Sequence, residues 1–248
     1  MPLTHYPYHI APAGDSAVLI DFGNTIDESI NRRVLALTTR LQSNLKGIRE
    51  VVPAYSSISV YFDLPLMRRQ TPKELLVFDF LKQHIEKILT EPIPLQVQDN
   101  KLVKIPVCYD AEFGPDREKI AETNNIAIDE LIALHCSRQY RVYMLGFLPG
   151  FSYLGEVDEK IAMPRKTYPQ PVEAGAVGIA SRQTGIYPLA SPGGWHIIGR
   201  TPLKLFDARE NEPTLLRAGD IVEFFPVSKD EFYSLKNEQS AEDEPENN

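Results

Sequence analysis

Residues 140–201 read YRVYMLGFLPGFSYLGEVDEKIAMPRKTYPQPVEAGAVGIASRQTGIYPLASPGGWHIIGRT, and this stretch decides the fold of the second half of the chain. It contains nine of the chain's 14 glycines, with prolines placed among aromatic residues and short β-branched runs. Glycine reaches backbone angles closed to other residues, whereas proline fixes φ and lacks a backbone donor. The stretch therefore predicts tight turns joining short strands, the pattern of a compact β-barrel with loops shaped for binding.

The amino-terminal part of the chain mixes strand and helix patterns. β-rich runs at 8–22 (broken by a turn), 48–54 and 57–62 predict strands. Apolar residues at helical spacing predict one helix from a capping box at Thr25 and a second from Thr71, and one more strand is expected afterwards. This order predicts a small α+β domain of ferredoxin-like type, and the alternative is a plait of different strand order.

A polar, proline-containing segment at 91–100 marks the expected domain boundary. We expect an α+β domain over residues 1–92 and a β-barrel domain over 101–236. Five acidic residues follow Lys236 without a basic residue among them, so 237–248 is expected to be a disordered acidic tail. Further expected elements are a strand at 101–109, helices at 116–124 and 128–137, and closing strands at 203–206 and 221–227.

Composition and charge indicate where the protein is located and which classes of partner it does not bind. The 248 residues carry a formal charge of −8, and without the five acidic residues of the tail the body carries −8 + 5 = −3. A nearly neutral body lacks the basic patch that nucleic-acid binding needs. Cys108 and Cys136 form no CxxC pattern, and the chain shows neither a signal peptide nor a run of about 20 apolar residues. We therefore expect a cytoplasmic protein that binds neither nucleic acid nor membrane.

Two long motifs carry a family resemblance. GFLPGFSYL at 146–154 and MPRKTYPQPVEAGAVGIASRQTGIYPLASPGGWHIIGRTPL at 163–203 resemble the family of the 5-oxoprolinase B subunit, which also contains the histidine-kinase inhibitor KipI. The family is related to the carboxyltransferase domain of urea carboxylase and, more loosely, to one half of allophanate-hydrolase-type proteins. The resemblance runs from about Tyr8 to Phe225. It implies a small α+β amino-terminal domain followed by a cyclophilin-like β-barrel.

Aromatic residues and glycines in these motifs are candidates for substrate binding. Phe147 and Phe151 flank a Pro-Gly turn, where they form either a binding platform or part of the barrel core. Gly193 and Gly194 precede Trp195, the only tryptophan of the chain. Paired glycines let backbone N–H groups approach a carboxylate or a developing oxyanion. The alternative is an ordinary turn with Trp195 as a core anchor.

Charged and hydrogen-bonding residues lie in and beside the same two motifs. Arg165, Arg182 and Arg200 each offer a planar guanidinium that can bind a carboxylate or phosphate at two points, and the alternative for each is a surface charge. Gln183 and Tyr187 supply hydrogen-bonding groups near Gly185 in the second motif. We predict that these side chains contact an acidic small substrate or an acyl phosphate.

Proton transfer and metal chemistry have fewer candidates. The chain has no HExxH, CxxC or GxSxG motif and no acidic metal loop, so no metal site is predicted. GWHIIGRT at 194–201 resembles a phosphate loop only superficially, because its bulky residues suit a buried strand. A lone histidine at the end of an apolar helical segment, such as His135, is more often structural. The family pattern nevertheless runs from such a histidine through YRV into GFLPGF, which makes His135 the candidate for proton transfer.

The resemblance implies a component of an ATP-dependent 5-oxoprolinase that converts 5-oxo-L-proline to L-glutamate. It implies a carboxyltransferase-like unit formed with the C subunit, whereas the A subunit would supply the hydrolase chemistry, and the sequence does not place ATP on this chain. Tyr187 and Arg200 would orient the ligand. The alternative function is a KipI-like inhibitor that blocks autophosphorylation of a sensor histidine kinase through an apolar patch at 147–151. A prolyl isomerase would rest on barrel similarity alone, and a fold does not carry a function.

Overall fold

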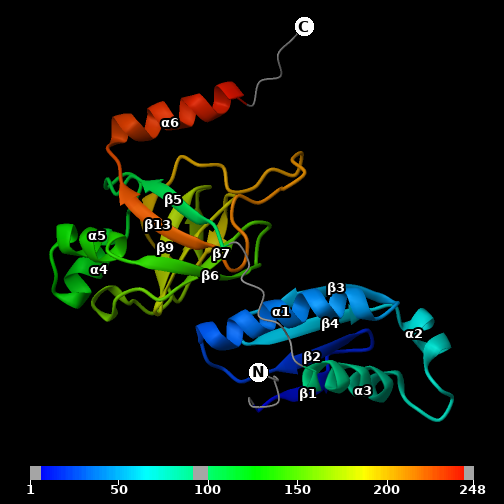
Figure 1. Cartoon of the computed structure of the whole chain (residues 1–248). Coiled ribbons are helices and arrows are strands. Elements are labelled where there is room, and N and C mark those ends of the chain that lie inside the picture. The colour runs from blue at the N-terminus through cyan, green and yellow to red at the C-terminus, as the bar shows by residue number, and fades with distance from the viewer. Residues whose placement is uncertain (1–6, 92–99, 243–248) are drawn as a thin grey trace, which may run out of the picture. The chain divides into compact units, whose positions relative to one another are not determined.

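The computed structural model describes residues 7–91 and 100–242. Contacts divide the chain into two compact units, Met1–Gln98 and Asp99–Asn248 (Figure 1). The boundary that the sequence predicts, in the polar segment at 91–100, stays a prediction, because residues 92–99 lie outside the described residues.

The first unit is a four-stranded antiparallel sheet with two main helices. The strand order is β1-β2-β4-β3, and helices α1 and α3 contact each other and share one apolar core with all four strands. Alternation places Ile58, Val60 and Phe62 of β4 in this core. The elements are β1 (His9–Pro12), β2 (Ala17–Asp21), α1 (Glu28–Asn44), β3 (Ile48–Pro53), β4 (Ser57–Phe62), α2 (Leu64–Gln70) and α3 (Val77–Thr90).

The strand order differs from the ferredoxin-like arrangement that the sequence predicts. That arrangement needs a strand after the second helix to lie beside the first strand of the plait. Here β1 takes that edge of the sheet, paired with β2 through the turn at 13–16, where Gly14 has a φ of +76°. Within residues 7–91 and 100–242, no strand after α3 joins this sheet. A hairpin this short closes at little entropic cost, so the edge is covered locally.

Both predicted helix caps in this unit are wrong, the first by two residues and the second by five. Helix α1 begins after Asp27, whose carboxylate accepts a hydrogen bond from the Ile30 N–H at 2.9 Å, rather than at Thr25. The helix predicted from Thr71 begins only at Val77, as α3, and a further helix that the sequence analysis did not predict, α2, lies immediately before Thr71. Thr71 ends α2, because its N–H and its hydroxyl both donate to the Met67 carbonyl, at 3.0 and 2.8 Å.

The second unit contains a nearly closed barrel of seven strands. Their order is β12-β9-β10-β7-β6-β13-β5, with β13 and β5 parallel and the other neighbours antiparallel. Two backbone hydrogen bonds between Cys108 and Arg200, of 2.9 and 3.0 Å, connect the ends of β5 and β12. This barrel-like sheet is consistent with the predicted cyclophilin-like barrel. The strands are β5 (Leu102–Val107), β6 (Gln139–Leu145), β7 (Ser152–Gly155), β9 (Ala176–Ala180), β10 (Gln183–Ile186), β12 (His196–Arg200) and β13 (Ile221–Pro226).

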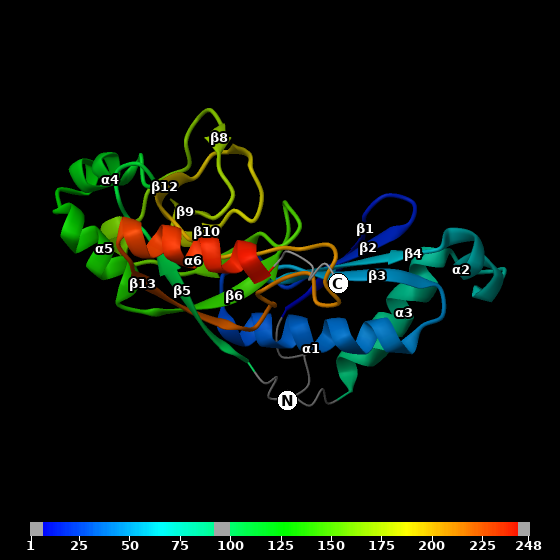
Figure 2. The ribbon, with the colours of Figure 1, turned by 90° about the horizontal axis from the view of Figure 1, so that it is seen from above.

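Shorter elements surround the barrel. Figure 2 shows β8 on a loop that projects from the barrel, and among the described strands β8 pairs with β11 alone. Helix α6 lies outside the barrel in Figure 1 and is anchored by Phe232, whose ring centroid is 4.5 Å from that of Phe113. The remaining elements are α4 (Arg117–Asn124), α5 (Ile128–Cys136), the 3-10 helix η2 (Glu159–Ile161), β8 (Gln170–Val172), β11 (Ser191–Gly193) and α6 (Lys229–Glu242).

The carboxy-terminal part corrects two expectations. Helix α6 continues to Glu242, so residues 237–242 are helical rather than disordered, and 243–248 lie outside the described residues. The strand predicted at 203–206 is reduced to one bridge between Phe206 and Thr214. In the described residues, no helix is both long and apolar enough to cross a membrane.

Candidate functional site

A cavity of about 270 Å³ lies on the outer surface of the barrel beside β7 and β10. Its lining comes from four segments of the sequence: the β6–β7 connection, the segment before β8, the β9–β10 turn, and β11 with the residues after it. Eight of the eleven predicted site residues line it: Phe147, Phe151, Arg165, Gln183, Tyr187, Gly193, Gly194 and Trp195. The other lining residues are Tyr153, Pro169, Ala180, Ser181 and Pro192.

Alternation along β10 separates the cavity from the barrel core. Thr184 and Ile186 are fully buried on the inner face, and Ile186 belongs to the barrel core. Gln183 and Gly185 face outward, where a Cβ on Gly185 would lie 2.9 Å from the Trp195 ring. Because Gly185 also pairs directly with Gly178 of β9, two adjacent strands lack side chains here. Because no side chain stands at these two positions, the rings of Phe151 and Trp195 pack directly against the sheet backbone.

Aromatic rings form one wall of the cavity. The Phe151 centroid lies 4.9 Å from that of Tyr187 and 5.4 Å from that of Trp195, both in edge-to-face geometry. These three side chains are almost fully buried, whereas Phe147 is 64% exposed and has a φ of +70°. Non-glycine residues with positive φ are uncommon and often occur at functional sites. Phe151 thus packs in an apolar cluster with Tyr187 and Trp195 beside the barrel core, Phe147 is exposed, and a binding platform stays a prediction.

Arg165 brings a positive charge to the rim of the cavity. Its Nη2 lies 3.5 Å from the position that a Cβ on Gly194 would occupy. Among the described residues, no carboxylate lies within ion-pair distance of Arg165. Burial raises the pKa of Tyr153 and of Tyr187, and the nearby Arg165 charge partly offsets this rise. The guanidinium is therefore available to an anion.

Gly193 and Gly194 both make contacts within the protein. A Cβ on Gly193 would overlap the Tyr187 hydroxyl, so only glycine permits this packing. The Trp195 backbone lowers the pKa of Tyr187 and, like the Arg165 charge, partly offsets the effect of burial. The carbonyl of Gly194 accepts a hydrogen bond from the Lys166 N–H at 2.8 Å. The turn thus fixes Tyr187 and the Arg165 segment, and a role of the Gly193–Gly194 backbone in holding negative charge stays a prediction.

His135 lies inside the barrel, on the opposite face of the sheet from the cavity. Its Nδ1 accepts from the Tyr109 hydroxyl at 2.7 Å, and its Nε2 lies 2.9 Å from Thr184 Oγ1. The Thr184 hydroxyl donates to the Gly178 carbonyl, so its oxygen accepts from Nε2–H, which fixes the tautomer. Burial lowers the pKa of His135 to about 3, so the ring is neutral. Proton transfer by His135 stays a prediction, and these contacts favour a structural role.

The two remaining predicted arginines also lie outside the cavity lining. Arg182 is half-exposed in the β9–β10 turn and forms ion pairs with Glu156 at 2.9 Å and Glu159 at 2.8 Å. Arg200 ends β12, and its Nε donates to the Ala174 carbonyl at 2.7 Å. Both guanidiniums are therefore engaged by the protein, in contrast to Arg165.

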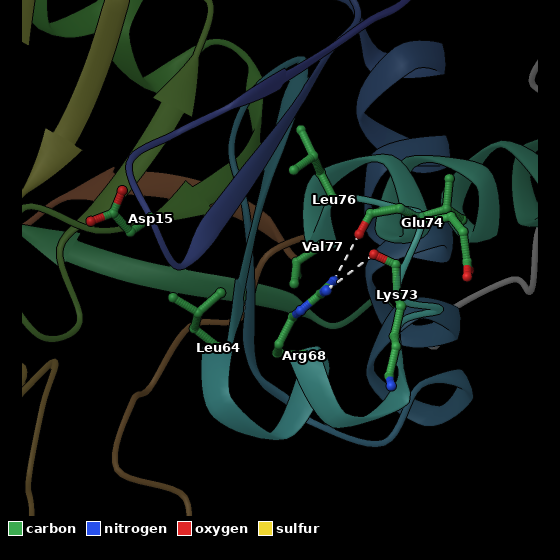
Figure 3. Close-up of a pocket in the computed structure, with 8 residues that line it drawn as sticks. Asp15, Leu64, Arg68, Lys73, Glu74, Leu76 and Val77 are labelled. Carbon is green, nitrogen blue, oxygen red and sulfur yellow. Dashed lines mark hydrogen bonds between the residues drawn. The ribbon is translucent and has the colours of Figure 1, made fainter.

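A second hollow lies in the amino-terminal unit, between α2 and the segment that leads into α3 (Figure 3). Its arginine, Arg68, donates to the carbonyls of Leu75 at 2.7 Å and Lys73 at 3.3 Å. The guanidinium therefore connects α2 to the next segment. Because this arginine is engaged by carbonyls and the described lining of the hollow contains no aromatic residue, the barrel cavity is the better candidate site.

The structure adds residues that the sequence analysis did not select. Ser181 lines the cavity with a φ of +52°, in the two-residue turn between Ala180 and Gln183. Gly178 and Gly185 stand at equal distances on either side of this turn, a symmetry that was readable in the sequence. Within the described ranges 7–91 and 100–242, no group of three or more His, Cys, Asp or Glu side chains is arranged to hold a metal ion.

Comparisons with known proteins agree with this architecture. A family model described as "Carboxyltransferase domain, subdomain C and D" matches residues 8–216. The 5-oxoprolinase B subunit of Bacillus subtilis (strain 168) is 43% identical over 236 residues, which are 94% of this chain and 98% of that protein. The crystal structure of TTHA0988 is 36% identical with a TM-score of 0.71, and the match covers 86% of this chain and 40% of that chain.

A larger enzyme contains the same fold. The crystal structure of the Kluyveromyces lactis urea carboxylase matches with a TM-score of 0.70 and 20% identity. The match covers 93% of this chain but only 23% of that chain. At this identity, the likeness shows a shared fold alone.

Proposed function

Because the chain belongs to the family of the 5-oxoprolinase B subunit, we propose that it is the B subunit of an ATP-dependent 5-oxoprolinase that converts 5-oxo-L-proline to L-glutamate. The observation that carries the proposal at residue level is the position of Arg165 at the rim of an aromatic cavity. The substrate is a small, flat lactam with one carboxylate. Its ring suits the wall of Phe151 and Trp195, and its carboxylate suits the guanidinium.

Tyr187 supplies a hydrogen-bond donor to this site. Tyr187 lines the cavity with its hydroxyl against the Gly193 backbone, where a tyrosine hydroxyl can donate its proton to a ligand. Because burial raises the pKa of Tyr187, the hydroxyl stays protonated at neutral pH. Arg165 therefore takes the role that the sequence analysis gave to Arg200, and Tyr187 keeps its predicted role of orienting the ligand.

The composition of the cavity argues for partner subunits. Its described lining contains no histidine, cysteine, lysine, aspartate or glutamate. Such a site binds and orients but offers no group that exchanges protons readily near neutral pH. We propose that ATP phosphorylates the lactam oxygen, that the C subunit completes the binding unit, and that the A subunit supplies the hydrolysis that opens the ring and releases phosphate. ATP is not assigned to any residue of this chain.

Kinase inhibition has less support. The apolar patch predicted at 147–151 would need exposed aromatic rings. Phe147 is exposed, but Phe151 is 1% exposed and packs against Tyr187 and Trp195. We therefore propose no second function.

Reconstitution with the purified A and C subunits tests the proposal. Glutamate release should require this chain, ATP and 5-oxoproline together. Arg165→Ala should raise the KM for 5-oxoproline, and Arg165→Lys should restore part of the loss because the charge remains without the two-point geometry. The matched control is Arg138→Ala, which removes an exposed arginine paired with Asp158 at 2.8 Å. Full activity of the complex without this chain would refute the proposal, and an unchanged KM in Arg165→Ala would remove Arg165 from the site.

A further inference from the structure

Arg165 stands on a segment that has no helix or strand of its own. The segment connects η2 to β8, and its side chains at 164 and 165 are exposed. An arginine side chain loses about 2 kcal/mol of rotamer entropy when it is fixed, and a mobile backbone would add to that cost. The residues on both sides of Arg165 are nevertheless tied to the barrel.

Main-chain and side-chain hydrogen bonds hold the segment before Arg165. Met163 exchanges two backbone hydrogen bonds with Ser181, of 3.2 and 2.6 Å. The Pro164 carbonyl accepts a hydrogen bond from the His196 Nε2 at 3.0 Å. Because a carbonyl only accepts, this nitrogen carries the proton. The segment is therefore fixed to the β9–β10 turn and to β12 up to the residue before Arg165.

A mostly buried ion pair holds the residue after Arg165. The Lys166 Nζ lies 2.6 Å from Asp116 Oδ2, and their side chains are only 16% and 14% exposed. The same carboxylate oxygen accepts the N–H of Ile197 at 2.7 Å, and the Asp116 N–H donates to the Ile197 carbonyl at 2.9 Å. Asp116 thus connects Lys166 to β12, beside the glycine turn that forms the cavity rim.

We propose that Asp116, acting through Lys166, is a positioning residue that holds Arg165 against the cavity rim at Gly194 for binding the substrate's anionic group. This inference rests on the proposed function, because it needs Arg165 to bind the substrate anion. Two anchored neighbours leave Arg165 little freedom except in its own side chain. Removal of one partner from a buried pair leaves an uncompensated charge, which favours a different position of the segment.

The variant Asp116→Asn tests the inference in the complete complex. Asparagine keeps an acceptor for the Ile197 N–H but faces Lys166 without a charge. If Asp116→Asn does not fold, then Lys166→Met removes the positive charge of the same ion pair instead. The matched control is Glu130→Gln, which removes one carboxylate charge from the exposed Lys160–Glu130 pair of 3.1 Å.

Two readouts separate positioning from a general loss of stability. Hydrogen exchange of the Lys166 amide, which donates to Gly194, reports the segment without substrate. We expect it to accelerate at least about tenfold in Asp116→Asn and to stay unchanged in the control. The KM for 5-oxoproline should rise between about 10- and 100-fold, as for a displacement of up to about 1 Å, with a smaller change in kcat.

The decisive comparison uses the Arg165→Ala background. If Asp116 acts through Arg165, then Asp116→Asn changes the KM there by less than about twofold. An equal increase in both backgrounds, or an unchanged exchange rate of the Lys166 amide, would overturn the inference while leaving the proposed function intact. A wild-type KM in Arg165→Ala alone would overturn the proposed binding role of Arg165, and the inference with it.

Discussion

Acidification from pH 7 to pH 4.5 should destabilise the barrel unit through His135. The pKa of this buried histidine is lowered from 6.5 to about 3 in the folded protein. Between these values the unfolded chain binds a proton that the folded barrel does not. The stabilising contribution of the neutral ring is therefore complete above pH 6.5 and is lost as the pH falls toward 3.

The magnitude follows from the two pKa values. One pKa unit corresponds to about 1.4 kcal/mol, so the free energy of unfolding should fall by roughly 2.5 kcal/mol between pH 7 and pH 4.5 because of His135 alone. Carboxylates also begin to titrate in this range, so the wild type must be compared with His135→Gln, which cannot titrate. The wild type should lose about 2.5 kcal/mol more than the variant over this interval.

Urea unfolding followed by tryptophan fluorescence provides the assay. Trp195 is the only tryptophan and lies in the barrel unit, so its emission reports this unit alone. His9→Gln, at an exposed position of β1 in the other unit, should keep the wild-type pH dependence. If His135→Gln does not fold, then the His135 ring protons in the wild-type NMR spectrum should show no titration between pH 7 and pH 4.5. Equal pH dependence in wild type and His135→Gln, or a titration of this ring near pH 6, would refute the reasoning.

Three further predictions concern packing. Gly185→Ala should shift the Trp195 emission and weaken 5-oxoproline binding in the complex, because the new Cβ would lie 2.9 Å from the tryptophan ring; an unchanged spectrum would contradict it. Phe232→Ala should cost about 3 kcal/mol of local stability, measured as faster hydrogen exchange in α6, since this 2%-exposed ring anchors the helix; unchanged exchange would show another anchor. Cys108 and Cys136 should react slowly with a thiol reagent at pH 8 until urea unfolds the protein, because burial raises the pKa of both thiols; rapid labelling of both in the native state would be the opposite result.

Local patterns determined much of the secondary structure and failed where two signals competed. The apolar stripe from Ile26 to Leu45 predicted α1, although both of its end residues lie outside the helix. Asp27 rather than Thr25 caps the helix, because the aspartate carboxylate accepts the Ile30 N–H. Thr71 followed by proline resembles a helix start, yet its hydroxyl ends the preceding helix. Capping residues act within one turn, so a sequence alone does not show on which side of such a residue the helix lies.

The sequence by itself predicted a site on the glycine- and proline-rich loops around residues 146–195, and eight of the residues that it selected line the cavity. It did not decide which charged groups remain free. The three arginines look equivalent in sequence, but the fold gives Arg182 and Arg200 protein partners and leaves Arg165 available. Likewise, His135 is close in sequence to the motif but lies across the sheet from the cavity. Side chains on a strand alternate between faces, and only strand pairing and barrel closure decide which face becomes core and which becomes site.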